Sequence, residues 1–279
     1  GTLGEKNSAL DHGTMIPLFF LSEYLGDTPT KFVRIGISGL PAHTHALLGQ
    51  SIAAAAERLG RRVICIASGD LSHRLTEAGA HGFAPEGAEF DALCTSFMKT
   101  GDFLSLLQIP GSFAETAGHC ALNGLWVLAG ALDSSAFDAK LYSYEGPFGV
   151  GYAVVSFTVT GRDEEHDYAA QLVRAEDAAI AELRAAEHDY VRLARESIEH
   201  YVRTHTYLPL PEDLPAGMET RAGAFVSIKK YGRLRGCIGT FVPMCRCLAE
   251  EILYNAVSAA LHDSRFEPIE KNELNRLVY

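Results

Sequence analysis

The sequence predicts an α/β protein of two domains, and three observations support this prediction. An apolar run at residues 62–67 is typical of a buried parallel strand, and it follows a short strand at 33–37 and a helix at 44–59. The chain has 279 residues, enough for two ordinary domains. After Gly161 the composition changes to a stretch rich in Asp, Glu, Ala and Arg. The strand–helix–strand order therefore indicates a parallel sheet in the first domain.

Composition limits the classes of function. Hydrophobic residues make up 47% of the chain and charged residues 21%, which is typical of globular proteins. The formal net charge of −11 disfavours general binding to nucleic acids, because that binding depends on cationic contacts to phosphates. The longest apolar run, residues 16–21, is too short for a membrane helix, and no signal peptide is recognised. We therefore expect a cytoplasmic protein with no nucleic-acid or membrane partner, whose six cysteines are mostly buried free thiols.

The first domain is expected to span residues 1–161. Gly and Pro residues at the ends of the apolar segments indicate where its helices and strands begin and end. Beyond the three elements above, the expected elements are helices at 15–25, 88–100, 103–108 and 118–132 and strands at 140–144 and 150–160. The two strands are joined by a turn, residues 145–149, whose Pro and Gly set the backbone dihedral angles.

The second domain is expected to span residues 186–279, after a solvated, partly helical linker at 162–185. Its expected elements are a helix at 189–205, a hairpin of strands at 224–229 and 234–241, and a helix at 248–261. This mixture of helices and a hairpin predicts an α+β domain.

Residues 68–73, Ser-Gly-Asp-Leu-Ser-His, directly follow the buried strand at 62–67. Reactive groups in α/β sheets gather beyond the carboxyl ends of strands. Asp70 can orient or charge-stabilise the imidazole of His73, whose ordinary pKa suits proton transfer at neutral pH. We therefore predict that His73 is an acid–base residue. Ser72 is not expected to be a nucleophile, because no Gly-x-Ser-x-Gly motif surrounds it.

Four segments occur together in order: residues 11–14 (Asp-His-Gly-Thr), 68–73, 117–120 (Ala-Gly-His-Cys) and 144–152. Together they resemble the LigB-like catalytic subunit of class III extradiol ring-cleavage dioxygenases and its Memo-like relatives. The resemblance covers residues 1 to about 160 and implies the C-terminal part of that domain, with the chain cut from a longer protein at both ends.

The resemblance implies a non-haem Fe(II) site, or another divalent metal, acting on a catechol-type aromatic and O₂. By position, His73 resembles the acid–base histidine of the family, and His12 resembles the histidine that contacts substrate and oxygen. The two histidine ligands of the family fall outside this chain, and its glutamate ligand falls at His119. A three-histidine site, ligation by Glu115 instead, and a helix-start histidine with no metal all stay open for this position. Without a carboxylate, altered chemistry or lost catalysis is expected.

Other candidates carry weaker signals. His43 and His45 form a His-x-His pair at a strand-end loop, for which solvated loop histidines are the favoured interpretation. Cys245 and Cys247 have Cys-x-Cys spacing rather than the Cys-x₂-Cys spacing of structural zinc sites. Cys237 lies near several Lys and Arg residues, which can lower a thiol pKa, although a buried strand cysteine is the commoner outcome.

Residues 231–240 and 263–268 resemble the AMMECR family, from about residue 186 to the end. Fusion of a LigB-like domain to an AMMECR-type domain resembles protein A of the AmmeMemoRadiSam system, which includes a radical SAM protein. Two interpretations follow: an iron-dependent extradiol dioxygenase-like oxidoreductase, or a non-catalytic metal-binding or scaffold module that partners a radical SAM protein. The sequence does not decide whether the chain is an enzyme.

Overall fold

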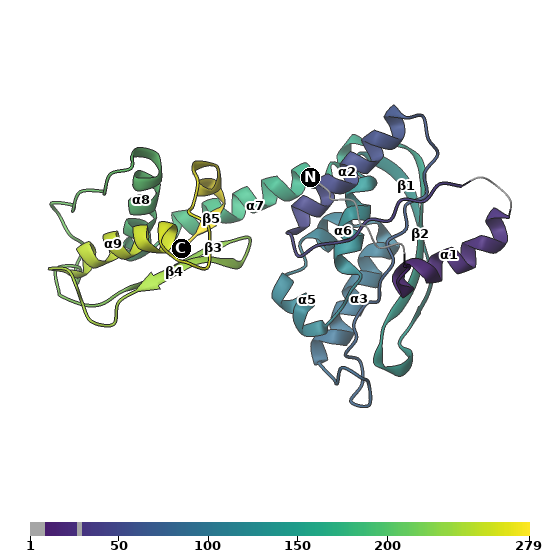
Figure 1. Cartoon of the computed structure of the whole chain (residues 1–279), viewed down its shortest axis with the longest axis horizontal. Coiled ribbons are helices and arrows are strands. Elements are labelled where there is room, and N and C mark those ends of the chain that lie inside the picture. The colour runs from purple at the N-terminus through teal and green to yellow at the C-terminus, as the bar shows by residue number, and fades with distance from the viewer. Residues whose placement is uncertain (1–8, 27–29) are drawn as a thin grey trace. The chain divides into compact units, whose positions relative to one another are not determined.

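The computed structural model describes residues 9–26 and 30–279. The chain divides into two compact units, residues 1–173 and 174–279, and the division falls within helix α7 (Tyr168–Ala185) (Figure 1). The stretch predicted as a linker thus contains the last residue of a strand, a short 3₁₀ turn at 164–166 and the whole of α7. Both units mix helices and strands, as the α/β prediction required.

The first unit is mostly helical. Its helices are α1 (His12–Leu25), α2 (Ala42–Arg58), α3 (Pro85–Thr100), α4 (Phe103–Leu107), α5 (Gly111–Ala117) and α6 (Leu122–Ala131). Strands β1 (Ser135–Glu145) and β2 (Tyr152–Arg162) form an antiparallel hairpin, joined by a 3₁₀ turn at Pro147–Gly149. α2 packs on α6, and α3 packs on β1 and α5. The core between them contains Phe90, Phe103, Leu106 and Leu122, all fully buried.

Two predictions about this unit are wrong in detail. The segments predicted as strands at 33–37 and 62–67 belong to no ladder within the described residues, because no strand lies beside them. The helix predicted from Gly118 begins at Leu122, and a separate helix, α5, ends at Ala117. Gly118 has φ +65°, a left-handed conformation that interrupts a helix, so the chain turns sharply there.

The second unit is an α+β arrangement. A sheet in the order β4 (Arg233–Gly239), β3 (Phe225–Lys230), β5 (Leu277–Val278) is antiparallel throughout. Helix α9 (Leu248–Leu261) packs on β3, β4 and α8 (Asp189–Thr204). The predicted hairpin and both predicted helices are confirmed to within a few residues. The largest fully buried side chains of its core are Ile198, Met218, Ile228, Leu274 and Leu277.

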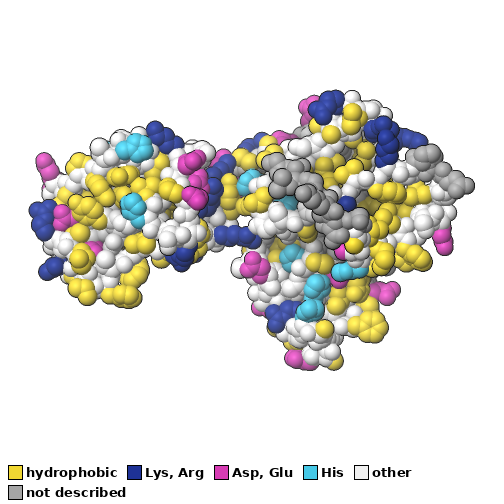
Figure 2. Space-filling view, viewed as in Figure 1, with side chains coloured by type: hydrophobic (Ala, Val, Ile, Leu, Met, Phe, Trp, Pro, Cys, Tyr) yellow, Lys and Arg dark blue, Asp and Glu magenta, His cyan; other side chains and the backbone are white. Residues whose placement is uncertain are grey.

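No helix in the described part of the chain is long and apolar enough to cross a membrane. Hydrophobic side chains nevertheless reach the surface of both units (Figure 2).

Candidate metal centre

The loop at residues 68–73 is held by the turn between β1 and β2. The N–H of Leu71 donates to the carbonyl of Gly151 at 2.9 Å, and the N–H of Gly151 donates to the carbonyl of Ser72 at 2.7 Å. Further along, the N–H of Leu75 donates to the carbonyl of Gly149 at 3.1 Å. Two of the motifs found in the sequence, 68–73 and 144–152, are therefore in direct contact, and backbone hydrogen bonds from the second hold the backbone of the first.

Asp91 of α3 also holds the loop at residues 68–73 in place. Its buried carboxylate accepts from the N–H of Ser72 at 2.7 Å and from the hydroxyl of Tyr144 at 2.8 Å. Burial raises the pKa of Asp91, with these two hydrogen bonds opposing the rise. Burial, and then the Asp91 carboxylate, raise the pKa of Tyr144, so the phenol stays protonated and donates. A Cβ at Gly151 would lie 1.9 Å from Asp91 Oδ2, so only glycine fits there.

The loop also lies directly against the segment that precedes α6. The N–H groups of Cys120 and Ala121 both donate to the carbonyl of Asp70, at 3.1 and 3.0 Å, and the N–H of His73 donates to the carbonyl of Gly118 at 2.6 Å. A Cβ at Gly69 would lie 2.7 Å from the Cα of Ala121, so this close approach requires glycine. A third motif, residues 117–120, therefore also contacts the loop at residues 68–73.

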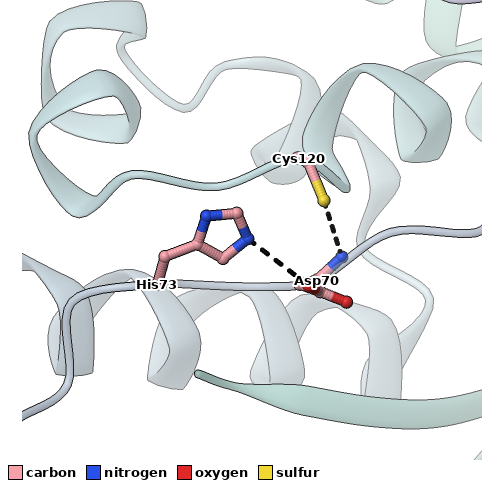
Figure 3. A group of neighbouring side chains, drawn as sticks. All are labelled: Asp70, His73 and Cys120. Carbon is pink, nitrogen blue, oxygen red and sulfur yellow. Dashed lines mark hydrogen bonds and ion pairs between the residues drawn. The ribbon is translucent and has the colours of Figure 1, made fainter. Parts of the chain in front are cut away.

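These contacts bring together three metal-ligating side chains: Asp70, His73 and Cys120 (Figure 3). One ligand atom from each lies within 4.8 Å of the other two. His73 Nε2 is 3.5 Å from Asp70 Oδ2, and Cys120 Sγ accepts a hydrogen bond from the N–H of Asp70 at 3.0 Å. Asp70 and His73 are half-buried, whereas Cys120 is exposed. The loop residues predicted to act together, Asp70 and His73, are therefore neighbours.

The three side chains fit a divalent cation. His73 Nε2 is buried and has no hydrogen-bond partner among the described residues, so its lone pair or proton is available. Carboxylate, imidazole and thiolate are all ligands of transition metals. Burial raises the pKa of the Cys120 thiol, the Asp70 carboxylate raises it further, and the Asp70 N–H opposes both. Cys120 therefore carries a proton at neutral pH that a bound cation would displace.

His119, the predicted metal ligand, has a different environment. Its Nδ1 accepts from the N–H of Leu122 at 3.3 Å, at the start of α6, and its ring stacks on Phe90 at 5.1 Å. Burial lowers the pKa of His119, and electrostatic repulsion from His73 lowers it further, against the opposing effect of Glu115. An Nδ1 that accepts a hydrogen bond leaves the proton of the neutral ring on Nε2. Coordination through Nε2 would require this hydrogen bond to break.

Two other histidines lie near the loop. The ring of His81 is tilted against that of His73, with 5.2 Å between centroids. His12 begins α1, and a Cβ at its neighbour Gly13 would lie 3.9 Å from Ser68 Oγ. The first turn of α1 is thus beside the loop that carries His73. Figure 2 shows histidine side chains gathered on one part of the surface of the first unit.

The weaker candidates of this unit have structural roles. His45 is buried, its Nδ1 lies 3.2 Å from the carbonyl of Pro41, and its Nε2 accepts from the N–H of Ser38. His43 Nε2 lies 3.1 Å from the hydroxyl of Thr44. Ser72 is fully buried, and its hydroxyl donates to the carbonyl of Ala117 at 2.8 Å. Neither His45 nor Ser72 is placed to act on a substrate.

Sequence reasoning missed Cys120, Asp91 and Tyr144. The six cysteines were expected to be mostly buried, but only Cys94 and Cys247 are, and Cys65 and Cys120 are exposed. All six cysteines are free thiols. A signal for Cys120 existed in its place beside His119 within the 117–120 motif, whereas nothing local distinguishes Asp91 from a surface aspartate of a helix.

In the second unit, charged side chains form two closed networks around β4. Asp263 accepts from the N–H of Cys237 at 2.8 Å and from Arg265 Nη2 at 2.7 Å, and the Arg265 hydrogen bonds hold the pKa of Asp263 well below its usual range. Glu273 pairs with Lys230 at 2.7 Å and Arg235 at 2.8 Å. Two basic neighbours expected to act on Cys237 are therefore engaged elsewhere.

Residues 4–155 match the family model described as the catalytic LigB subunit of aromatic ring-opening dioxygenase, and the chain belongs to this family. Residues 191–279 match the AMMECR1 family, so the chain is a fusion of the two. Both resemblances drawn from the motifs are confirmed.

Among curated proteins, Protein CA_C1420 of Clostridium acetobutylicum is 37% identical over 268 residues, covering 95% of this chain and 56% of that protein. A Thermotoga maritima protein is 46% identical over 94 residues, covering 33% of this chain and 54% of that protein. The crystal structure of uncharacterized protein PH0010 from Pyrococcus horikoshii shares 35% identity over 32% of this chain and 45% of that one, with a TM-score of 0.30. The chain spans about half the length of the curated relatives it matches.

Proposed function

We propose that the first unit belongs to a metal-dependent oxidoreductase that opens a catechol-type aromatic ring with O₂, with Fe(II) as the metal. The observation that carries this proposal is the group formed by Asp70 and His73 of the loop at residues 68–73 with Cys120 of the segment before α6, in a LigB-family chain. A bound ferrous ion supplies the electron transfer between the aromatic ring and O₂ that neither reactant achieves alone.

In this proposal Asp70 and Cys120 hold the metal, and His73 moves the proton. His73 Nε2 accepts a proton from a hydroxyl of the catechol and later returns it to the product. The carboxylate 3.5 Å away stabilises the imidazolium that forms in between. The side chain of His73 is 23% exposed, but its Nε2 is buried, so a local movement of side chains would have to bring a substrate hydroxyl to this atom. His12, on the adjacent first turn of α1, is the proposed contact to substrate.

The test separates metal binding from proton transfer. The protein is loaded with Fe(II) without oxygen, its bound metal is measured, and oxygen uptake is followed with catechol-type compounds. His73→Ala is expected to keep the metal and lose turnover at least about 100-fold, the usual contribution of a general acid–base residue. Cys120→Ser is expected to lose metal, and His262→Ala, an exposed histidine of the second unit, is the control. A loaded protein that cleaves no catechol, or a His73→Ala variant with full activity, would contradict the proposal.

The position of His119 favours a second candidate function, a non-catalytic metal-binding or scaffold module that partners a radical SAM protein. His119 occupies the place of the family's carboxylate ligand and accepts a hydrogen bond at the start of α6. Under this alternative, the protein binds metal and co-purifies with the radical SAM partner but consumes no oxygen. His119→Glu would then not restore oxygen uptake, whereas under the enzymatic proposal it should leave or increase it.

A further inference from the structure

The Cys-x-Cys motif of the second unit lies where a loop, residues 240–247, leads into helix α9. Cys247 is the residue that caps this helix, and Cys245 lies in the loop before it. Cys247 is 8% exposed, Cys245 is half-buried, and both are free thiols. Met244, the residue before the motif, is 76% exposed. Three sulfur atoms thus lie within four consecutive residues, 244–247, and the function proposed above uses none of them.

The backbone of this loop is held by two side chains of opposite charge. The buried carboxylate of Glu251 accepts from the N–H groups of Met244 and Cys245, both at 2.8 Å. Arg221 donates to the carbonyls of Pro243 and Cys245, at 3.0 and 3.2 Å. The main chain that carries Met244 and Cys245 is therefore fixed before any ligand arrives, and a fixed site loses less conformational freedom on binding.

A hollow of about 600 Å³ on the surface of the second unit opens onto Met244 and Cys245. Besides these two residues, its walls comprise Arg221, Arg246, Glu250 and Tyr254. Among the described residues, Arg221 is paired with no carboxylate, because its guanidinium donates to main-chain carbonyls. The hollow is therefore open to a small ion and has positive charge beside the sulfur atoms.

The two carboxylates beside the motif are already engaged. Arg246 Nε and Nη2 donate to Glu250, at 3.2 and 3.0 Å. One oxygen of Glu251 accepts from the hydroxyl of Thr240, and the other accepts from the two N–H groups given above. In the described part of the chain, neither cysteine of the motif belongs to a group of three histidine, cysteine or acidic side chains whose ligand atoms lie within 4.8 Å of one another. Sulfur is therefore the main donor that this place offers to a metal ion.

These sulfur donors select the kind of metal. A structural zinc site needs four ligands, with cysteine pairs spaced more widely than Cys-x-Cys. Thiolate and thioether ligands select soft ions such as Cu(I), which accepts fewer ligands than zinc. Burial, and then the carboxylate of Glu251, raise the pKa of Cys245 to about 11, and Cys247 adds to the rise. The two thiols are thus near enough to interact, and Cys245 keeps its proton at neutral pH until a cation displaces it.

We propose that Cys245 and Cys247 bind one Cu(I) ion, with the thioether of Met244 as a third, weaker ligand. Ligation forms two sulfur–copper bonds and releases the protons of both thiols to solvent, and the copper keeps its oxidation state. One Cu(I) with two thiolates carries a single negative charge, which Arg221, Arg246 and the N-terminus of α9 stabilise. The inference concerns the second unit alone and does not depend on the reaction proposed for the first.

A copper titration tests the proposal in the whole chain, with all cysteines reduced and oxygen excluded. Cu(I) is supplied as its bicinchoninate complex, and the colour that this complex loses counts the ions taken up by the protein. Cys245→Ser and Cys247→Ser are each expected to bind one Cu(I) fewer than the wild type. Cys237→Ser, which removes a half-buried thiol of β4, is expected to bind as many as the wild type. Equal copper in all four proteins would overturn the proposal.

Alkylation assigns the ion to its ligands in the wild type, so the test does not depend on how a variant folds. The same Cu(I) supply is expected to slow labelling of Cys245 by N-ethylmaleimide at least about tenfold, because only a free thiolate attacks the reagent. Labelling of Cys237, read from its own peptide by mass spectrometry, is expected to keep its rate. An unchanged rate at Cys245, or equal slowing at Cys237, would overturn the proposal. Equal protection of Cys245 by Zn(II) would overturn the assignment to a soft monovalent ion.

Discussion

The sulfur of Cys120 accepts a hydrogen bond from the backbone N–H of Asp70, 3.0 Å away, while the carboxylate of the same aspartate lies close enough to oppose its ionisation. One residue thus acts on the thiol in two opposite ways. Burial and the carboxylate raise the pKa of Cys120, and the N–H lowers it. In the absence of metal the balance favours the thiol over the thiolate.

This balance predicts the reactivity of Cys120. Asp70→Asn keeps the backbone N–H and removes the charge, so the pKa of Cys120 should fall and its alkylation by iodoacetamide at pH 7 should quicken about two- to fivefold. Peptide mass spectrometry resolves the six cysteines. Cys65 is the internal control, because its thiol is exposed and only burial raises its pKa. An unchanged rate at Cys120, or an equal increase at Cys65, would count against the stated role of the carboxylate.

Gly151 lies against the loop at residues 68–73, whereas Gly161 lies in an open part of β2. We therefore expect alanine to lower the stability at the first position and not at the second. Gly151→Ala places a Cβ 1.9 Å from Asp91 Oδ2 and 3.2 Å from Leu71 Cβ. We expect the free energy of unfolding to fall by about 1–3 kcal/mol or more, the range for overpacking. Urea unfolding followed by the fluorescence of the single tryptophan, Trp126, measures this in the first unit. Gly161→Ala is the control, since its Cβ would meet nothing nearer than 4.0 Å and should change stability little.

Ser72 is predicted to matter for stability and not for chemistry. Its hydroxyl donates to the carbonyl of Ala117 and accepts from the N–H of Arg74, both in a fully buried position. Ser72→Ala should lower the free energy of unfolding by about 1–3 kcal/mol, because buried polar groups lose their partner. Ser68→Ala, on the exposed part of the same loop, should stay within about 0.5 kcal/mol. A fluorophosphonate probe that labels the wild type at Ser72 would show that the structural role is incomplete.

Glu273 predicts how the second unit responds to acid. Burial raises its pKa, but hydrogen bonds from Arg235 and Lys230 outweigh this and lower the pKa to about 2, against an ordinary value of 4.5. A lowered pKa stabilises the fold above the ordinary value, and this stabilisation is lost as pH falls from 4.5 toward about 2. Glu273→Gln should flatten this part of the pH dependence of urea unfolding, measured by circular dichroism. Glu267→Gln, an exposed neighbour, should keep it.

Elements with a strong local pattern were predictable from the sequence. The amphipathic stretch of α8 and the apolar stretch of α9 lie within a residue of their predicted bounds. The turn at 147–149 follows from its Pro and Gly. The segment at 62–67 has the composition of a strand, but a strand also needs a neighbour, and the sequence of the segment carries no information about that neighbour.

The site was predictable only in part, for the same reason. Asp70 and His73 share one loop, so their proximity follows from the sequence. Cys120 joins them only because Gly69 and Gly118 let two distant segments approach, and that contact is a property of the folded chain. His119 was predicted as a metal ligand because of the family motif. The hydrogen bond that its Nδ1 accepts from the N–H of Leu122 depends on where α6 begins, which the motif does not show.

The turn between β1 and β2 holds the site loop through the main chain of Gly149 and Gly151, and not through its own side chains. Phe148, at the tip of this turn, is 92% exposed. Its backbone is left-handed, with φ +58°, so this position suits residues that tolerate that conformation. It is a suitable attachment point for a fluorophore that reports on metal or substrate arriving at Asp70 and His73.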